Sequence, residues 1–310
     1  MVGTALLLAG AVKACSPQPY PEVPGLLRIF GGTGMGLGEL SYPRAAALEA
    51  DGNLLVVDKS ARIQRFTPDG TPVMAWRMPD YDAGKPTGLG VGPDGRIYVA
   101  DTHYSRVLVF APDGREVMRF GHRGTGPGEF ILPTDVLVTR DGFIYVGEYS
   151  GNDRISRFAP DGRYLSSFGG PEAGAARLQR PQGLLPDADG SLWVADACNH
   201  RICRFTAEGA LVATLGREGT GAGELRFPYG LDWLSDGTLV VVEYGNNRVQ
   251  RFTREGQSLG TWGSAGRRPG QLAYPWAVVV GPGDRMYVID SGNNRVQVLD
   301  ARHPGVWRQP

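Results

Sequence analysis

The sequence predicts an all-β protein, a six-bladed β-propeller with four antiparallel strands in each blade, because three markers recur six times in one register. The first is a proline, and successive prolines stand 43 to 48 residues apart. The second is an Asp or Glu that ends a hydrophobic run, and the third is an arginine four to six residues later. In chain order the markers are the prolines Pro43, Pro86, Pro133, Pro181, Pro228 and Pro275, the acids Asp58, Asp101, Glu148, Asp196, Glu243 and Asp290, and the arginines Arg62, Arg106, Arg154, Arg201, Arg248 and Arg295.

Each repeated unit reads as four strands joined by turns and one longer loop. In the second unit the expected strands span residues 87–91, 96–100, 106–110 and 116–121. Asp94-Gly95 and Asp113-Gly114 separate neighbouring strands, and such turns favour glycine because they need positive φ. Four short antiparallel strands per unit, repeated around a ring, are typical of propeller blades.

The two ends of the repeat predict how the ring closes. After the third strand of the last unit, residues 295–299, only a C-terminal tail at 304–310 follows, so the sixth blade lacks a fourth strand. Residues 26–30 have the form of a fourth strand that belongs to no preceding unit. We therefore expect the N-terminal strand to complete the sixth blade and remove its open edge.

Two units carry motifs that resemble a known repeat family. Residues 243–252 read Glu-Tyr-Gly-Asn-Asn-Arg-Val-Gln-Arg-Phe, and residues 290–298 read Asp-Ser-Gly-Asn-Asn-Arg-Val-Gln-Val. With the glycine-rich linkers at 124–130 and 219–225, these segments resemble NHL repeats over residues 26–303. The resemblance implies the propeller fold, but propellers host binding and catalysis alike.

The N-terminus predicts export from the cytoplasm. Residues 1–14 hold an apolar run too short to span a bilayer as a helix, and Val12, Ala14 and Cys15 resemble a lipobox, in which Cys15 would carry lipid. Lys13 is atypical in that motif, and a frayed apolar N-terminus is the alternative. The expected organisation is an export or lipoprotein signal at 1–14, a Pro-rich tether at 15–25, the propeller at 26–303 and the tail at 304–310. This organisation predicts a periplasmic or cell-surface protein, anchored to the membrane through a lipidated Cys15.

Charge composition argues against nucleic acid as a partner. The chain has 32 Lys and Arg residues against 32 Asp and Glu residues, so no net field attracts a phosphate backbone. We call the face of the disc that carries the proline loops and the acid-to-arginine loops the top face. RNA binding, which the resemblance to the NHL domains of tripartite-motif regulators implies, would need this top face to be basic.

The six repeated acids and arginines indicate a structural role rather than a metal-binding or catalytic one. A ring of carboxylates suggests cation binding, but a single metal or catalytic site rarely needs sixfold repetition. An acid and an arginine at fixed spacing in every unit favour an internal ion pair or a backbone cap within each blade.

Departures from the repeat give the candidate channel residues. The second residue after each proline is mostly Gly or Ala, which suits close packing near the axis. Asp135 breaks that rule, and Asp232 breaks a similar rule two positions later in its unit. In the axial channel these carboxyls would bind a cation or act as acid and base, or else accept hydrogen bonds from backbone amides or water.

The top face collects the candidate binding residues. They mix aromatic rings with arginine and amide groups, a composition that marks binding hot spots, although rings also serve as packing between blades. The candidates are Arg44, Thr134, Gln182, Tyr229, Trp276, His103, Tyr149 and Tyr244.

Cys198, His200 and Cys203 use residue types that bind metals, but lack the paired spacing of a zinc site. A disulfide or a pair of free thiols is the favoured interpretation.

These observations favour a non-enzymatic extracytoplasmic binding or scaffold module that presents its top face to a protein, peptide or glycan. No catalytic motif appears, and no cofactor is expected. The alternative is a metal-dependent lyase or hydrolase with Ca or Zn in the axial channel at Asp135 and Asp232, as resemblance to propeller lyases and lactonases implies.

Overall fold

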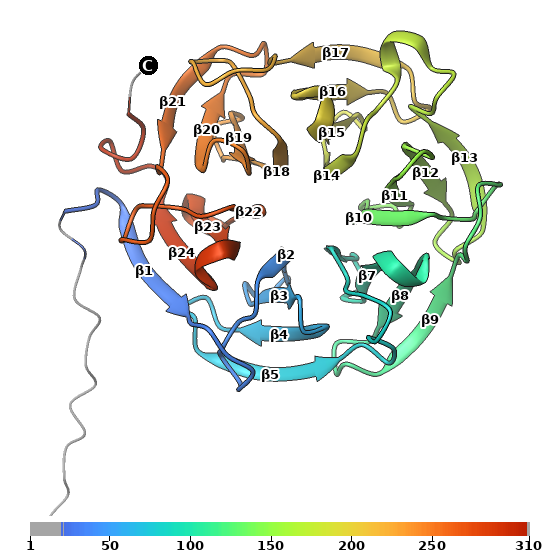
Figure 1. The fold of residues 1–310 in the computed structure, drawn as a ribbon, viewed down its shortest axis with the longest axis horizontal. Helices are drawn as coiled ribbons and strands as arrows, with labels where there is room; N and C mark the ends of the chain where they lie inside the picture. Colours follow the sequence, from blue (N-terminus) through green and yellow to red (C-terminus); the bar gives the residue numbers. More distant parts are fainter. Residues whose placement is uncertain (1–19, 21, 309–310) are drawn as a thin grey trace, which may run out of the picture.

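Six four-stranded antiparallel sheets stand around a central axis in the computed structural model, which describes Tyr20 and residues 22–308 (Figure 1). The six-bladed all-β prediction is confirmed. Blades one to five each use four strands consecutive in the chain, whereas the sixth takes one strand from the N-terminus.

The strands fall into four sets by their place in the blade. The inner strands are β2 (Pro43–Leu48), β6 (Gly88–Val91), β10 (Leu132–Val138), β14 (Pro181–Pro186), β18 (Pro228–Trp233) and β22 (Ala277–Gly281). The second strands are β3 (Leu54–Asp58), β7 (Ile97–Asp101), β11 (Ile144–Tyr149), β15 (Leu192–Asp196), β19 (Leu239–Glu243) and β23 (Arg285–Asp290). The third strands are β4 (Arg62–Phe66), β8 (Arg106–Phe110), β12 (Arg154–Phe158), β16 (Arg201–Phe205), β20 (Arg248–Phe252) and β24 (Arg295–Asp300). The outer strands are β5 (Pro72–Arg77), β9 (Glu116–Phe120), β13 (Tyr164–Phe168), β17 (Leu211–Leu215), β21 (Ser258–Trp262) and β1 (Leu26–Gly31).

Five short 3-10 helices lie in the connections between these strands. They are η1 (Thr102–Tyr104), η2 (Gly174–Ala176), η3 (Ala197–Asn199), η4 (Pro282–Asp284) and η5 (Ser291–Asn293). No helix of the described chain is long and apolar enough to span a bilayer. The predicted signal at 1–14 and the lipidation candidate Cys15 lie outside the described residues.

The N-terminal strand closes the ring as the sequence predicts. β1 pairs antiparallel with β24, from Leu26 opposite Leu299 to Gly31 opposite Arg295. After β1 the linker returns to the last blade's top loop, where the Gly32 amide donates to the Asn294 carbonyl at 2.9 Å. β24 therefore keeps no open edge.

The C-terminal residues pack back onto the disc. Arg308 exchanges two backbone hydrogen bonds of 2.9 Å with Thr261 of β21, and Val306 and Trp307 are buried. The indole of Trp307 donates to the Ala301 carbonyl at 2.8 Å. This segment covers the outer edge of the fifth blade beside the strand that closes the sixth.

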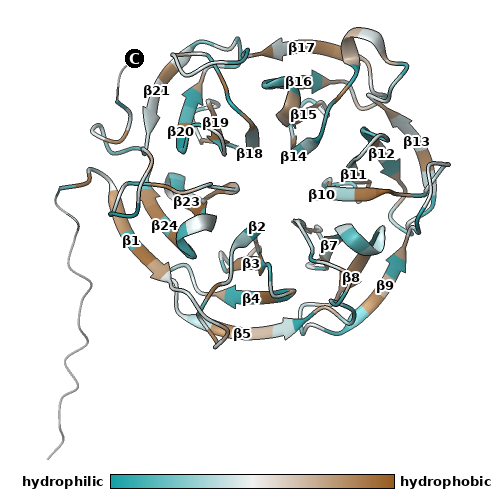
Figure 2. Ribbon diagram, in the orientation of Figure 1, coloured by the Kyte–Doolittle hydropathy of each residue, from teal (hydrophilic) through white to brown (hydrophobic). Residues whose placement is uncertain are grey.

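The hydrophobic core lies between the blades. Six clusters of buried residues form, and each joins two neighbouring sheets. One of them packs Val57 and Ile63 of the first blade against Val99 and Leu108 of the second. Hydrophobic residues accordingly occur in all six blades (Figure 2). The second strands are buried on both faces because they stand in the middle of this packing.

The repeated acids and arginines form six buried ion pairs, as the repeat predicts. Every acid is 0% exposed, and nitrogen–oxygen distances run from 2.5 Å for Glu243–Arg248 to 2.9 Å for Asp101–Arg106. In five blades the acid also accepts the amide of the residue two before the repeat proline. Asp101 lacks this amide and leaves its Oδ1 without a partner, and burial raises its pKa to about 6.

In five of the six pairs the arginine also binds carbonyls of the linker that precedes its blade, whereas Arg106 donates to the carboxylate of Asp80. Arg154 donates to the carbonyls of Thr125, Gly126 and Glu129 at 2.9 to 3.1 Å. Arg248 does the same with Thr220, Gly221 and Glu224. The recurring glycine-rich linkers are therefore wrapped around the arginines, which explains why the two motifs recur together.

Candidate functional site

The inner strands line an axial channel whose cavity measures about 210 Å³. Small residues near the top of these strands allow the close approach. A Cβ on Gly88 would lie 2.4 Å from the Cα of Asp135, and one on Gly230 would lie 2.8 Å from the Cα of Ala277. The rest of the lining is mostly Ala, Leu and Val, so the channel is narrow and largely apolar below its mouth.

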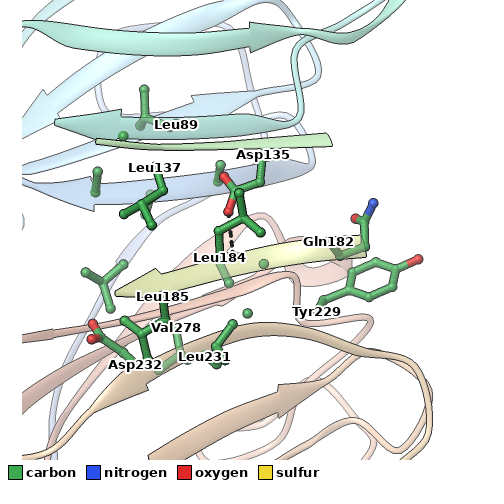
Figure 3. Close-up of a pocket in the computed structure, with 18 of the residues that line it drawn as sticks. Leu89, Asp135, Leu137, Gln182, Leu184, Leu185, Tyr229, Leu231, Asp232 and Val278 are labelled. Carbon is green, nitrogen blue, oxygen red and sulfur yellow. Dashed lines mark hydrogen bonds between the residues drawn. The ribbon is translucent and has the colours of Figure 1, made fainter. Parts of the chain in front are cut away.

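Asp135 and Asp232 both face this channel, as Figure 3 shows. Asp135 accepts the amide of Leu184 at 3.0 Å, and Asp232 accepts the amides of Val280 at 2.6 Å and Trp233 at 2.8 Å. Leu184 and Val280 belong to the next blade, so each carboxyl ties two inner strands together. Burial among apolar neighbours raises the pKa of both carboxyls to about 7, against which the amide hydrogen bonds act.

The described residues around these carboxyls do not fit calcium or zinc. Asp135 stands opposite Gly147, next to Glu148, whereas Asp232 stands opposite Val240, three residues before Glu243. The two carboxyls therefore lie at different depths, and their oxygens accept backbone amides. Among the described residues no three His, Cys, Asp or Glu side chains gather as a metal site would require.

The mouth of the channel on the top face holds a continuous group of rings and guanidiniums. Tyr229 stacks on Tyr244 at 4.6 Å between ring centroids, and both rings contact Trp276, at 5.0 and 5.8 Å. The ring of Tyr274 lies 5.2 Å from that of Tyr244. The group, called the mouth cluster below, is Tyr42, Arg44, Tyr149, Arg180, Gln182, Tyr229, Tyr244, Tyr274 and Trp276.

Two arginines flank the rings of the mouth cluster. The guanidinium carbon of Arg44 lies 5.3 Å from the Trp276 centroid. That of Arg180 lies 5.0 Å from Tyr149 and 5.6 Å from Tyr229. Neither guanidinium forms an ion pair or hydrogen bond with any described residue, and the Nε atom of each is buried without a partner. Burial lowers the pKa of Arg44, and the positive charge of Arg180 lowers it further.

Loop geometry places several of these side chains over the mouth. The residue before the repeat proline has positive φ in four blades, between 49° and 57° at Tyr42, Arg180, Phe227 and Tyr274. Bulky residues rarely adopt this conformation. Its amide is held by the preceding blade's top loop, where the acceptors are Asn294, Asp153, His200 and Asn247 at 2.6 to 3.1 Å. We call each of these hydrogen bonds an interblade clasp.

Six of the eight predicted binding residues belong to the mouth cluster: Arg44, Gln182, Tyr229, Trp276, Tyr149 and Tyr244. The other two lie elsewhere. Thr134 is 1% exposed and donates its hydroxyl to the Pro181 carbonyl, so it joins two blades and is not presented to a ligand. His103 is exposed on the second blade, where its ring contacts Lys85, and within the described chain no aromatic contact links it to the cluster.

Sequence reasoning missed Tyr42, Arg180 and Tyr274. All three occupy the position directly before a repeat proline, and the strand pattern gives no reason to expect bulky side chains with positive φ there. The available signal was composition, because this position holds Tyr, Arg, Phe and Tyr in the first, fourth, fifth and sixth units.

Cys198 and Cys203 are free thiols, which leaves the second of the two favoured interpretations. Cys203 is fully buried in β16, where burial first and the nearby Asp196 second raise its pKa to about 12. His200 takes part in a clasp, and its ring packs at a tilt against that of Phe227, with 4.5 Å between centroids. Cys203 and His200 therefore have structural roles, in the fourth blade and at its contact with the fifth blade.

Comparisons with known proteins agree on the repeat and the fold. A family model described as a six-bladed β-propeller matches residues 92–159, and the NHL repeat model matches residues 178–205 and 272–299. No curated protein matches the chain.

Similar solved structures are distant in sequence. A gluconolactonase from Xanthomonas campestris is 19% identical over 89% of this chain and 97% of that one, with a TM-score of 0.64. Virginiamycin B lyase from Staphylococcus aureus is 20% identical over 90% and 89%, with a TM-score of 0.60. A chain of a nidogen/laminin complex is 20% identical over 71% and 79%, with a TM-score of 0.54. At these identities the likeness shows the fold alone.

Proposed function

The chain is a six-bladed β-propeller that carries NHL repeats, and from that premise we propose that it is a binding module whose top face holds a protein, peptide or glycan ligand at the mouth of the axial channel. The mouth cluster is the observation that supports this proposal. Tyr, Trp and Arg dominate binding hot spots because they offer large, partly rigid contact surfaces with polar ends.

Catalysis is the competing proposal, and one observation favours it. Asp135 and Asp232 have pKa values of about 7, which suits an acid or base at neutral pH. Against it, both carboxyls accept amides of neighbouring inner strands, in a cavity of only about 210 Å³. We therefore rank binding first.

The function is tested by measuring ligand binding on a glycan array and a peptide array. The test variant is Tyr274→Ser, because Tyr274 is 53% exposed and its loss should leave the core intact. The matched control is Val212→Ser, which removes an apolar side chain of similar exposure, 52%, from the outer strand β17. Binding that is lost in Tyr274→Ser and kept in Val212→Ser supports the proposal.

Equal binding by both variants, or no bound ligand on either array, would contradict it. Conversion of a bound ligand into product, abolished by Asp135→Asn or Asp232→Asn, would establish the enzyme instead.

Location remains part of the proposal. We propose that residues 1–14 direct export and that Cys15 carries lipid, so that the propeller stands at the periplasmic or cell surface. Mass spectrometry of the mature N-terminus, with Cys15→Ser as control, tests this. An unmodified N-terminus that begins at Met1 would overturn it.

A further inference from the structure

The mouth cluster contains positive charge that no described residue neutralises. Arg44 and Arg180 have no carboxylate partner, whereas each repeat arginine forms an ion pair with a fully buried acid. Holding a guanidinium partly out of water without a counter-ion costs free energy. Charged groups whose pKa values are shifted by burial cluster at functional sites.

We propose that Arg44 and Arg180 bind the carboxylate of a ligand that carries it on a hydroxyl-bearing ring, the chemistry of a uronic acid. The proposal rests on the proposed function of the top face and names the ligand class for that face.

The two guanidiniums lie over neighbouring rings of the mouth cluster. Arg44 contacts Trp276, Trp276 contacts Tyr229 at 5.0 Å between centroids, and Arg180 contacts Tyr229, so two adjacent rings connect the arginines. Burial is the main cause that lowers the pKa of Arg44, and the positive charge of Arg180 lowers it further. An anion that bridges them would offset both the repulsion and the burial.

No described residue accepts a hydrogen bond from either guanidinium, and of its nitrogens only Nε is buried without a partner, so the Nη groups are free to donate to a ligand. Those N–H groups match the two oxygens of a carboxylate in a paired arrangement. Neither Asp135 nor Asp232 forms an ion pair with these arginines, because both are engaged by inner-strand amides.

The neighbours of the arginines suit a hydroxyl-bearing ring. Burial raises the pKa of Tyr229 to about 12, so its phenol stays neutral and can donate or accept a hydrogen bond. Gln182 is only 7% exposed, and its Oε1 has no partner among the described residues, which leaves a buried acceptor at the same mouth (Figure 3). Aromatic faces beside such groups pack against the apolar face of a sugar ring. A peptide C-terminus would use the arginines but leave this hydroxyl-binding surface unmatched.

The experiment is calorimetric titration of the full chain with D-glucuronate, using D-glucose and acetyl-phenylalanine as the comparison ligands. We expect D-glucuronate to bind, and each of Arg44→Gln and Arg180→Gln to weaken it about tenfold or more, because each removes a charged hydrogen-bond donor. D-glucose, which lacks the carboxylate, should bind far more weakly. The double variant should bind no better than either single one.

Arg157→Gln is the matched control. Arg157 also stacks on a ring, Phe143 at 4.2 Å, and its Nε is also buried without a partner, but it lies beside the Asp-Gly turns of the opposite face. This variant removes the same charge from the chain and should bind D-glucuronate like the wild type. If Arg157→Gln weakens binding equally, net charge explains the result and the proposal fails.

Three further results would overturn the proposal: no binding of D-glucuronate, unchanged binding in both mouth variants, or tighter binding of acetyl-phenylalanine. The proposed function survives any of these if an array ligand still depends on Tyr274, so the two failures are distinguishable. Should a Gln variant fail to fold, Arg44→Lys and Arg180→Lys replace it. They keep the charge but lose the planar donor pair, and weaker binding in them supports the proposal while unchanged binding contradicts it.

Discussion

Two sets of arginines in this propeller differ in their surroundings. The six repeat arginines each form an ion pair with a buried acid; five of them also bind carbonyls of the preceding linker, and Arg106 binds the carboxylate of Asp80 there. The guanidiniums of Arg44 and Arg180 lie over aromatic rings and form no ion pair or hydrogen bond with any described residue. The repeated arginines therefore serve the fold, and the two unrepeated ones are charged groups that the fold itself does not use.

The two sets of arginines should therefore respond differently to substitution. Removing one member of a buried pair leaves a charge in a low-dielectric interior, which is strongly destabilising. Removing an arginine that has no partner leaves nothing unpaired behind. The comparison thus predicts opposite sensitivities for stability and binding, and four experiments order them by size.

The largest expected loss of stability comes from substituting one of the six repeat arginines. Arg154→Ala should lower the free energy of unfolding by about 3–5 kcal/mol, because it leaves Glu148 buried and frees three linker carbonyls. Urea denaturation measures it. A loss no larger than that of Arg44→Ala would remove the distinction between the two sets.

Asp135 and Asp232 in the axial channel extend the comparison to buried charges of the opposite sign, because they have backbone amides but no arginine as partners. Asp135 and Asp232 have pKa values of about 7 in the folded protein against an ordinary value of 3.8, so the folded state binds protons more tightly than the unfolded chain. The stability that the protonated carboxyls give is present below about pH 4 and is lost as the pH rises towards 7.

Asp135→Asn should therefore flatten this fall, by on the order of 1–2 kcal/mol at pH 8, since the partial solvent exposure of Asp135 reduces the full effect. The amide oxygen can still accept from Leu184. Urea denaturation from pH 4 to 8 measures the effect. A variant whose stability falls with pH as steeply as that of the wild type would show that Asp135 does not titrate in this range.

The interblade clasps each join two neighbouring blades through one hydrogen bond, so breaking one should have a smaller effect on stability. Asn294→Gly removes the acceptor of the Tyr42 amide while tolerating the φ of 54° at this position, and should cost about 1 kcal/mol. Thermal unfolding measures it. Asn294→Asp keeps an acceptor and is the control; equal losses in both variants would assign the effect to something other than the clasp.

The smallest expected change in stability is at the mouth itself. Arg44→Gln should alter the free energy of unfolding by less than about 1 kcal/mol, in either direction, because it removes a desolvated charge with no partner. Urea denaturation beside the binding measurement checks this. A loss of several kcal/mol would place Arg44 with the structural arginines.

Much of the fold was predictable from sequence because the repeat reports the same physical event six times. The prolines, acids and arginines mark where each blade starts, turns and is held, and the unpaired strand at 26–31 could only close the sixth blade. The candidate site was only partly predictable. Thr134 occupies the same repeat position as Arg44, Tyr229 and Trp276, yet its side chain turns into a blade seam and not towards the mouth.

The sequence alone determined the number of blades, their boundaries, the closing strand and the structural role of the repeated acids, because each depends on local pattern and spacing. Only the tertiary structure decided that Tyr42, Arg180 and Tyr274 join the mouth, and that Arg44 and Arg180 lack partners. The reason is geometric. A ring brings together residues some 47 positions apart in sequence, and whether a charge is neutralised depends on side chains from several blades at once.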